Sequence, residues 1–471
     1  MREDMDSRKR WWALTVLCLG VLMIVLDTTI VNVALPSIRS DLGFTETSLV
    51  WVVNAYMLTF GGFLLLGGRL GDLYGHRRVF LFGLTLFTLA SLGCGLANSQ
   101  LVLIVARAVQ GVGGAVVSAI ALSLIITLFT EPSERAKAMG VYGFVCAGGG
   151  SIGVLLGGVL TDALSWRWIF LVNLPIGAAV FALCLLLLPG GSGPATRARL
   201  DVGGAVTVTS SLMLAVYAIV NGNEAGWTSA RTLGLLGAAA VLMLIFLMIE
   251  SRVQTPLMPL SLFRLRNVAT ANVLGVLWAA AMFAWFFISA LYMQLVLGYS
   301  AMQVGLAFLP ANLIMAVFSL GLSARIVLRF GIRWTLCAGL LMGALGLALF
   351  SQAPLNGRFV ADILPGMLLL GLGAGIAFNP MLLAAMSDVG PDQSGVASGV
   401  VNTAFMMGGA LGLAVLASLA AFRTQSLLAH GMDATAALNS GYQLAFLIGA
   451  VFAAAAAVLG GALLRTRKSG A

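Results

Sequence analysis

Long apolar runs, separated by short polar and basic segments, follow one another along the whole chain. A helix that crosses a bilayer needs about 20 mostly apolar residues, and this length identifies the runs that qualify. We expect fourteen spanning helices, at residues 12–36, 48–68, 79–98, 101–127, 138–161, 167–188, 203–222, 232–250, 268–297, 302–324, 331–351, 361–384, 395–421 and 440–464. The longest connections, 189–202 and 251–267, are too short for a soluble domain. The second alternates polar and apolar residues, which favours a position in the membrane plane.

The composition identifies the class of protein. Of 471 residues, 60% are hydrophobic and 9% are charged, and the mean hydropathy is +1.03. A water-soluble protein of this length cannot bury so much apolar surface, so the sequence predicts an all-α polytopic membrane protein. The net charge of +9 comes from short basic clusters between the apolar runs. The net charge therefore does not indicate a nucleic-acid partner.

Candidate ligands for metals or nucleotides are scarce. The two histidines, His76 and His430, lie in connections, and no Gly-x-x-x-x-Gly-Lys-[Ser/Thr] loop is present. We therefore expect no metal, no cofactor and no fused ATP-binding domain. The cysteines lie in apolar runs without Cys-x-x-Cys spacing, which predicts no disulfide. They are Cys18, Cys94, Cys146, Cys184 and Cys337.

The basic residues indicate the orientation. If the N-terminus is cytoplasmic and each run crosses the membrane, 20 Lys and Arg fall inside, 5 fall outside and Arg107 lies within a helix. Cytoplasmic segments carry the excess of Lys and Arg in membrane proteins. We therefore expect a multi-pass protein of the cell (inner) membrane with both termini in the cytoplasm. The basic residues Arg8–Arg10 precede an apolar run too long for a signal peptide, so the first helix is expected to remain.

Two basic connections suggest an internal repeat. Gly68–Arg78 joins the second and third helices, and Ser323–Arg333 joins the tenth and eleventh; each has a glycine before its last arginine. This predicts two related six-helix halves, 1–188 and 268–471, with two inserted helices and their linkers in 189–267. Related halves with a site between them are typical of transporters.

Asp27 and Arg107 are charged residues inside apolar runs. At about 1.5 Å of rise per residue, antiparallel helices place them in the same half of the bilayer. Burial favours the neutral form of a carboxyl group, and a nearby arginine favours the charged form. Motion that alters water access or the distance between the two would load or release a proton. The simpler interpretations are a static ion pair, or an arginine that reaches outward to the interface.

Four segments resemble the fourteen-spanner drug:proton antiporters of the major facilitator superfamily, the EmrB/QacA type. They are the connection Gly68–Arg78 and the motifs Leu26–Pro36, Ala106–Gly111 and Trp166–Gly177. The resemblance implies a monomeric, proton-coupled exporter of small lipophilic compounds, cations among them, that works by alternating access within membrane lipid. A symporter, or a lipid or metabolite exporter, would have the same fold. A membrane enzyme or a non-transporting protein is the rival from another class.

The resemblance also implies an inner gate. The first basic connection would contribute Gly68, Asp72, Gly75, Arg77 and Arg78 and meet the start of the thirteenth helix when the inner side is closed. The other candidate gate residues are Glu131, Glu134, Arg325, Arg329, Arg333, Asp388 and Asp392. Ordinary positive-inside charge explains the arginines equally well. The fifth helix resembles the antiporter motif at Gly149, Gly153, Gly157 and Gly158, without the family's proline. Plain close packing of helices is the alternative role of these glycines.

Polar and aromatic side chains amid apolar ones are candidates for a substrate cavity. Polar groups inside a bilayer face the bundle or water, and aromatic residues and methionine suit a lipophilic site. The candidates are Asn32, Asn54, Tyr56, Gln110, Trp285, Gln294, Asn312, Asn379, Asn402 and Met406. For each of them, a hydrogen bond between helices is the alternative.

Overall fold

The structure is a computed structural model that describes residues 7–129, 131–188, 200–253, 256–389 and 394–464, and all of its regular elements are helical. The first part of the chain forms α1 (Ser7–Leu42), α2 (Val50–Tyr74), α3 (His76–Gly95), α4 (Gln100–Leu128), α5 (Pro132–Ala163), α6 (Trp168–Leu171) and α7 (Asn173–Leu187). The middle part forms α8 (Val202–Ala225), α9 (Ala230–Arg252) and the 3₁₀ turn η1 (Leu260–Arg264).

The last part begins with α10 (Arg266–Leu291), η2 (Tyr292–Val296), α11 (Ala301–Val317) and η3 (Phe318–Leu322). It continues with α12 (Ser323–Phe350), η4 (Phe359–Ile363), α13 (Leu364–Met386), α14 (Ser394–Ala429) and α15 (Ala434–Leu463). The segments η2, η3 and η4 are single π-helical turns.

The predicted all-α class is confirmed. Among the described residues, 13 segments are long and apolar enough to cross a membrane, with α6 and α7 forming one of them. The shorter apolar helix α11 has 17 residues and runs directly into η3. The described residues therefore contain 13 or 14 apolar spans, and the count of fourteen stays a prediction. Most of the connection 189–202 lies outside the described residues, and 251–267 contains η1 with the buried Leu262.

The two basic connections share a backbone conformation. Gly75 ends α2 with φ 89°, and Gly331 interrupts α12 with φ 78°. Only glycine adopts positive φ without steric cost, so both positions need it. The helix beginning at His76 and the helical stretch after Gly331 thus start from the same kind of bend. The likeness noticed in the sequence therefore extends to the backbone.

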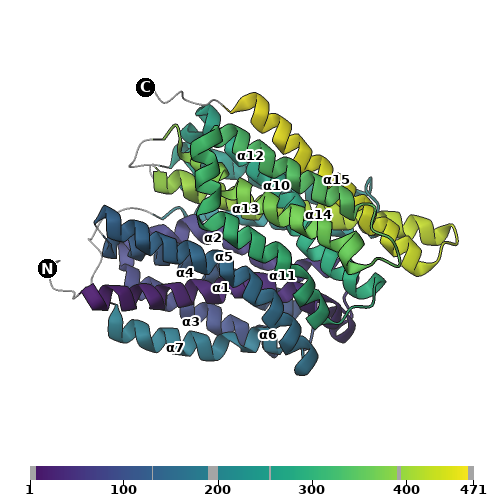
Figure 1. Cartoon of the computed structure of the whole chain (residues 1–471), viewed down its shortest axis with the longest axis horizontal. Coiled ribbons are helices and arrows are strands. Elements are labelled where there is room, and N and C mark those ends of the chain that lie inside the picture. Colours follow the sequence, from purple (N-terminus) through teal and green to yellow (C-terminus); the bar gives the residue numbers. More distant parts are fainter. Residues whose placement is uncertain (1–6, 130, 189–199, 254–255, 390–393, 465–471) are drawn as a thin grey trace.

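The helices run roughly alongside one another, as Figure 1 shows. The start of α1 and the end of α15 lie at the same end of the bundle (Figure 1), which we call the terminal face. We call the other end the opposite face. Helices α1, α3, α4 and α7 pack together, and α12, α13 and α15 do so with α10 and α14.

In the first group, α2 packs on α4 and α5 packs on α1; in the second, α11 packs on α13. The main contacts between the two groups are the packing of α5 on α11 and of α2 on α14, and α1 also touches α10 and α11. The helix α8 touches both α2 and α14, and α9 packs on α8. The two middle helices thus lie beside the seam between α2 and α14.

Candidate functional site

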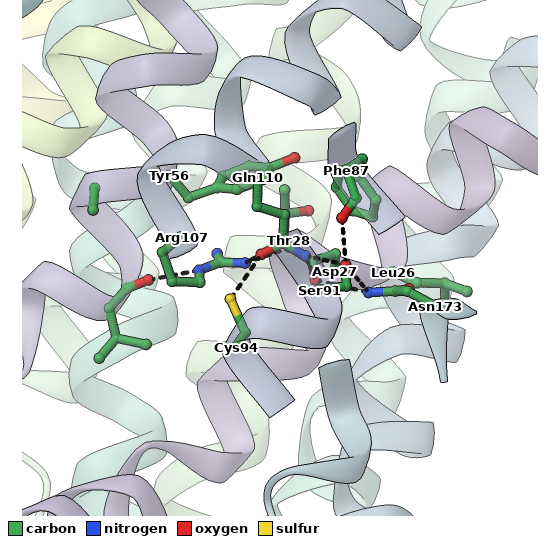
Figure 2. A network of polar contacts seen from close by, with 12 residues as sticks. Leu26, Asp27, Thr28, Tyr56, Phe87, Ser91, Cys94, Arg107, Gln110 and Asn173 are labelled. Atoms are coloured by element: carbon green, nitrogen blue, oxygen red, sulfur yellow. Dashed lines mark hydrogen bonds and ion pairs between the residues drawn. The ribbon is translucent and has the colours of Figure 1, made fainter. Parts of the chain in front are cut away.

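A buried ion pair lies among α1, α3, α4 and α7. The Arg107 Nη1 atom on α4 lies 2.5 Å from the Asp27 Oδ2 atom on α1. Asp27 is 0% exposed and Arg107 is 1% exposed. Figure 2 shows the two side chains pointing toward each other between the helices. The structure thus brings together the two charges that the sequence placed at one depth.

Neutral polar side chains complete the coordination of Asp27. Gln110 Nε2 donates to Asp27 Oδ1 at 2.7 Å and to Ser91 Oγ at 2.8 Å. Asn173 Nδ2, at the first residue of α7, donates to Asp27 Oδ1 at 3.1 Å. All of these side chains are buried. The carboxylate therefore accepts three hydrogen bonds from three different residues, as a buried charge requires.

Arg107 is held on its other sides as well. Its Nε donates to the Val52 carbonyl at 2.9 Å, and its Nη1 also donates to Gln110 Oε1 at 2.7 Å. Its guanidinium carbon lies 4.4 Å from the centre of the Tyr56 ring and 5.6 Å from that of Phe170. Cation–π contacts of this kind stabilise a desolvated guanidinium. The arginine is therefore packed in the bundle and does not reach out to the interface.

The network contains residues that the sequence did not assign to it. Gln110 and Tyr56 were candidates for the substrate cavity, but the structure places them beside Arg107. Ser91 and Asn173 received no role. Their signal was weak: each is one polar residue in an apolar run, and Asn173 lies in the quoted motif Trp166–Gly177.

A cavity of about 700 Å³ lies beside this network, toward the terminal face. Its walls come mainly from α1, α2, α4 and α14. The wall from α1 consists of Val21, Ile24, Val25 and Thr28, which recur at helical spacing and so share one face. Asp27 adjoins Thr28 in the chain but belongs to another face and is sealed from the cavity.

Two of the ten candidate substrate residues line the cavity, namely Asn402 and Met406 on α14. Asn54 Nδ2 instead donates to the Ala410 carbonyl at 2.8 Å, which ties α2 to α14. Gln294 Nε2 donates to the Val33 carbonyl at 3.0 Å. These amides therefore link the two helix groups.

The remaining candidates lie within helix packing, buried except for the half-buried Asn379. Asn379 Nδ2 donates to the Ser319 carbonyl at 3.0 Å, and Asn32 Nδ2 donates to the Thr29 carbonyl at 3.3 Å. Trp285 packs against Phe308, with ring centres 5.7 Å apart. Asn312 is 2% exposed, and its Nδ2 has no partner within the described part of the chain.

The helix groups are joined near the opposite face. Asp162 Oδ2 at the end of α5 accepts the backbone N–H of Met302 in the first turn of α11 at 2.9 Å. A Cβ built on Gly158 would lie 2.7 Å from the Ala301 carbonyl oxygen, so α5 and α11 are in direct backbone contact. With Gln294 bridging to α1, these contacts hold the two groups together on this face, whereas the cavity lies toward the other.

The glycines of α5 fit it closely to α1. A Cβ on Gly149 would meet Val25 at 2.9 Å, one on Gly153 would meet the Leu26 carbonyl oxygen at 2.9 Å, and one on Gly157 would meet the Ile30 carbonyl oxygen at 2.7 Å. These positions recur every fourth residue and form a smooth face without side chains. The antiporter-like motif thus lies against the part of α1 that carries Asp27.

The candidate gate residues have different partners in this structure. Glu134 pairs with Arg10 at 3.0 Å, and both the backbone N–H and the Nδ2 of Asn267 donate to Asp388 at 3.3 Å. Arg77 Nη2 donates to the Leu185 carbonyl at 2.7 Å. The other positions are as follows: Arg78, Glu131, Arg325 and Arg329 are exposed, Arg333 is partly buried, and Gly68 lines the cavity. Asp392 and the side chains of Asp72 and Cys146 lie outside the described residues.

Comparison with known proteins places the chain in a family. Its sequence matches the Major Facilitator Superfamily over residues 17–413. It is 39% identical over 469 residues to the puromycin resistance protein pur8 of Streptomyces alboniger, a match that covers 98% of this chain and 93% of that protein. It is 42% identical over 450 residues to the cephamycin export protein CmcT of Amycolatopsis lactamdurans, with 95% and 91% covered.

The fold agrees with this assignment. A solved structure of a bacterial homologue of the human lysosomal transporter Spinster matches with a TM-score of 0.67 at 16% identity, over 98% of each chain. Apolar helices recur throughout the described residues, which is the pattern of a multi-pass membrane protein. Because the family match runs from within α1 into α14, the chain belongs to the Major Facilitator Superfamily, whose members are membrane transporters rather than enzymes.

Proposed function

We propose that this protein is a proton-coupled antiporter that exports small lipophilic compounds by alternating access. The observation that carries the proposal is the Asp27–Arg107 pair, fully buried in an apolar bundle next to a cavity. Ionisable groups in a membrane are expensive to bury and are usually functional. A puromycin resistance protein and a cephamycin export protein are similar over nearly the whole chain.

The cavity indicates the class of substrate. Its wall is mainly aliphatic and aromatic, with Asn402 and Ser398 as polar groups on α14. Arg69 is the one charged residue among the described residues that line it. The mainly apolar wall suits lipophilic molecules. We therefore propose small lipophilic compounds as the substrate class, with the terminal face in the cytoplasm as their side of entry.

The coupling follows from the geometry of the pair. In the observed arrangement Arg107 and two amides stabilise the Asp27 carboxylate. If α1 shifts relative to α4, the carboxylate loses its cation and takes up a proton, because an isolated buried charge is strongly disfavoured. Return of Arg107 expels the proton. Since Thr28 borders the cavity, the same shift of α1 reshapes the wall that the substrate contacts.

The test is transport by the purified protein in lipid vesicles with an imposed pH gradient. Asp27→Asn keeps the size of the side chain and removes its charge, so we expect loss of gradient-driven export with normal insertion. Glu224→Gln removes an exposed carboxylate at the end of α8 and should behave like the wild type. Full proton-driven export by Asp27→Asn would contradict the assignment. Movement of substrate together with protons would identify a symporter, and no flux at all would favour a non-transporting protein.

A further inference from the structure

Two buried acidic side chains lie where α8 and α9 meet the segment that follows α9. Asp201 is the N-cap of α8 and is 5% exposed. Glu250 lies in the last turn of α9 and is 3% exposed. Neither belongs to the network around Asp27, and export as proposed above assigns them no role. Acidic side chains are almost never this deeply buried without a partner.

Each carboxyl group uses one oxygen and leaves the other unused. Asp201 Oδ1 accepts the backbone N–H of Gly204 at 2.8 Å, and Glu250 Oε2 accepts that of Met258 at 3.2 Å. Asp201 Oδ2 and Glu250 Oε1 are buried without a hydrogen-bond partner among the described residues. A Cβ built on Gly204 would lie 2.5 Å from Oδ2 and 3.1 Å from Oε1. Both unused oxygens therefore border the same small space.

The charges that act on Glu250 come from Asp201 and from Arg69 on α2. Arg69 Nη2 donates to the Pro256 carbonyl at 2.7 Å. Two buried carboxylates that share a site cannot both stay ionised. An ionised carboxylate also accepts hydrogen bonds without donating any, whereas a protonated one donates. A single proton between Oε1 and Oδ2 would satisfy both unused oxygens at once.

We propose that Asp201 and Glu250 hold one proton between them and form a second protonation site, separate from Asp27. Glu250 carries the proton and donates it to the Asp201 carboxylate. Asp201 stays charged because it caps the N-terminus of α8, where the helix dipole favours an anion. Glu250 lies at the C-terminus of α9, where the dipole disfavours one.

The pair also connects the middle helices to the mouth of the cavity. Glu250 accepts a hydrogen bond from the Met258 N–H, and the Pro256 carbonyl accepts one from Arg69. Arg69 and Leu257 both line the cavity. Loss of the shared proton places two like charges in one buried space and pushes apart the contact between Asp201 and Glu250. The 256–258 segment therefore loosens from the mouth as the pH rises.

Infrared spectroscopy of the purified protein tests the site without measuring transport. We expect the wild type at neutral pH to show a protonated-carboxyl C=O band that Glu250→Gln removes. Asp201→Asn, whose amide oxygen still accepts a hydrogen bond, should shift that band without removing it. The controls Glu224→Gln and Asp27→Asn should leave the band in place. A spectrum that Glu250→Gln does not alter would mean that Glu250 carries no proton, and would overturn the proposal.

Thermal unfolding in detergent gives a second readout. The folded protein holds a proton that the unfolded chain releases, so wild-type stability falls as the pH rises through the titration of the pair. The amide that Glu250→Gln introduces donates a hydrogen bond at every pH. The part of the fall in stability that comes from this pair should therefore be missing in Glu250→Gln. If its unfolding temperature follows the wild type at every pH, the shared proton is refuted. Because neither measurement uses a substrate, failure of Asp27→Asn to alter export would leave this site untouched.

Discussion

The asymmetry between the two charges of the buried pair gives the sharpest prediction. Asp27 can lose its charge by taking up a proton, whereas Arg107 stays charged at any accessible pH. In Asp27→Asn, Arg107 keeps Gln110 Oε1 and the Val52 carbonyl as neutral acceptors but has no anion within reach. Removing one member of a buried pair costs about 3–5 kcal/mol. We expect this loss of stability at acidic and alkaline pH alike.

The reverse substitution should behave differently. In Arg107→Gln, Asp27 keeps Gln110 and Asn173 as donors and can also be neutralised by a proton. The loss of stability caused by Arg107→Gln should therefore be large at alkaline pH and become smaller as the pH is lowered. The double variant has no buried charge, and replacing a buried pair by neutral groups is often close to neutral for stability. The two single losses should therefore be strongly non-additive, with a coupling energy of at least about 3 kcal/mol, the upper end for residues in contact, and more at alkaline pH.

The assay is unfolding of the four proteins of this cycle, followed by tryptophan fluorescence at acidic and alkaline pH. Transport in vesicles is measured in parallel, and all three variants should lose coupling to the pH gradient. Additive losses of stability would show that the two charges do not interact energetically. If the stability of Arg107→Gln does not change with pH, Asp27 takes up no proton when its partner is removed. Either result would refute the reasoning from the buried pair.

Three further predictions concern the contacts between helices and the mouth of the cavity. Gly157→Ala should lower the free energy of unfolding by about 1–3 kcal/mol through overpacking and slow transport. Gly143→Ala on the same helix meets open space and should raise the free energy of unfolding by up to about 1 kcal/mol through helix propensity. Unfolding curves of the two variants measure the difference. Asp162→Ala removes the acceptor of the Met302 N–H and should raise labelling from the opposite face several-fold, since about 1 kcal/mol changes a two-state ratio about fivefold. Arg69→Gln removes the donor to the Pro256 carbonyl and should lower the export rate in vesicles, because the segment that carries Leu257 to the cavity wall loses this hydrogen bond.

The sequence predicted the features that depend on position along a helix. Apolar runs of spanning length located the helices, and residue counts within two runs set Asp27 and Arg107 at one depth. Glycines four residues apart indicated a smooth face on α5. Each of these follows from the fixed rise and turn of a helix. None of them requires knowledge of which helices become neighbours.

The features that depend on how each helix is rotated were not predictable. Asn54 and Gln294 are polar residues in apolar runs, as Asn402 is, yet the first two bridge the helix groups and the third lines the cavity. Ser91 carries the same pattern and belongs to the ion-pair network. The gate contacts depend in addition on the conformation, because they were expected with the terminal side closed. Here that side is hollowed, so their absence from the described residues does not test them.

The helix α5 links the ion pair to the seam between the helix groups. On one side Gly153 contacts the Leu26 carbonyl, directly beside Asp27 in the chain, and on another Gly158 contacts Ala301 of α11. The glycine face leaves no side chains that interlock with α1, so sliding along it meets little steric resistance. Opening the opposite face must separate α5 from α11, and α5 then moves against α1 at the level of the carboxylate. Movement at the seam and the environment of Asp27 are thereby coupled through one helix, as the proposed exchange of a proton for a substrate requires.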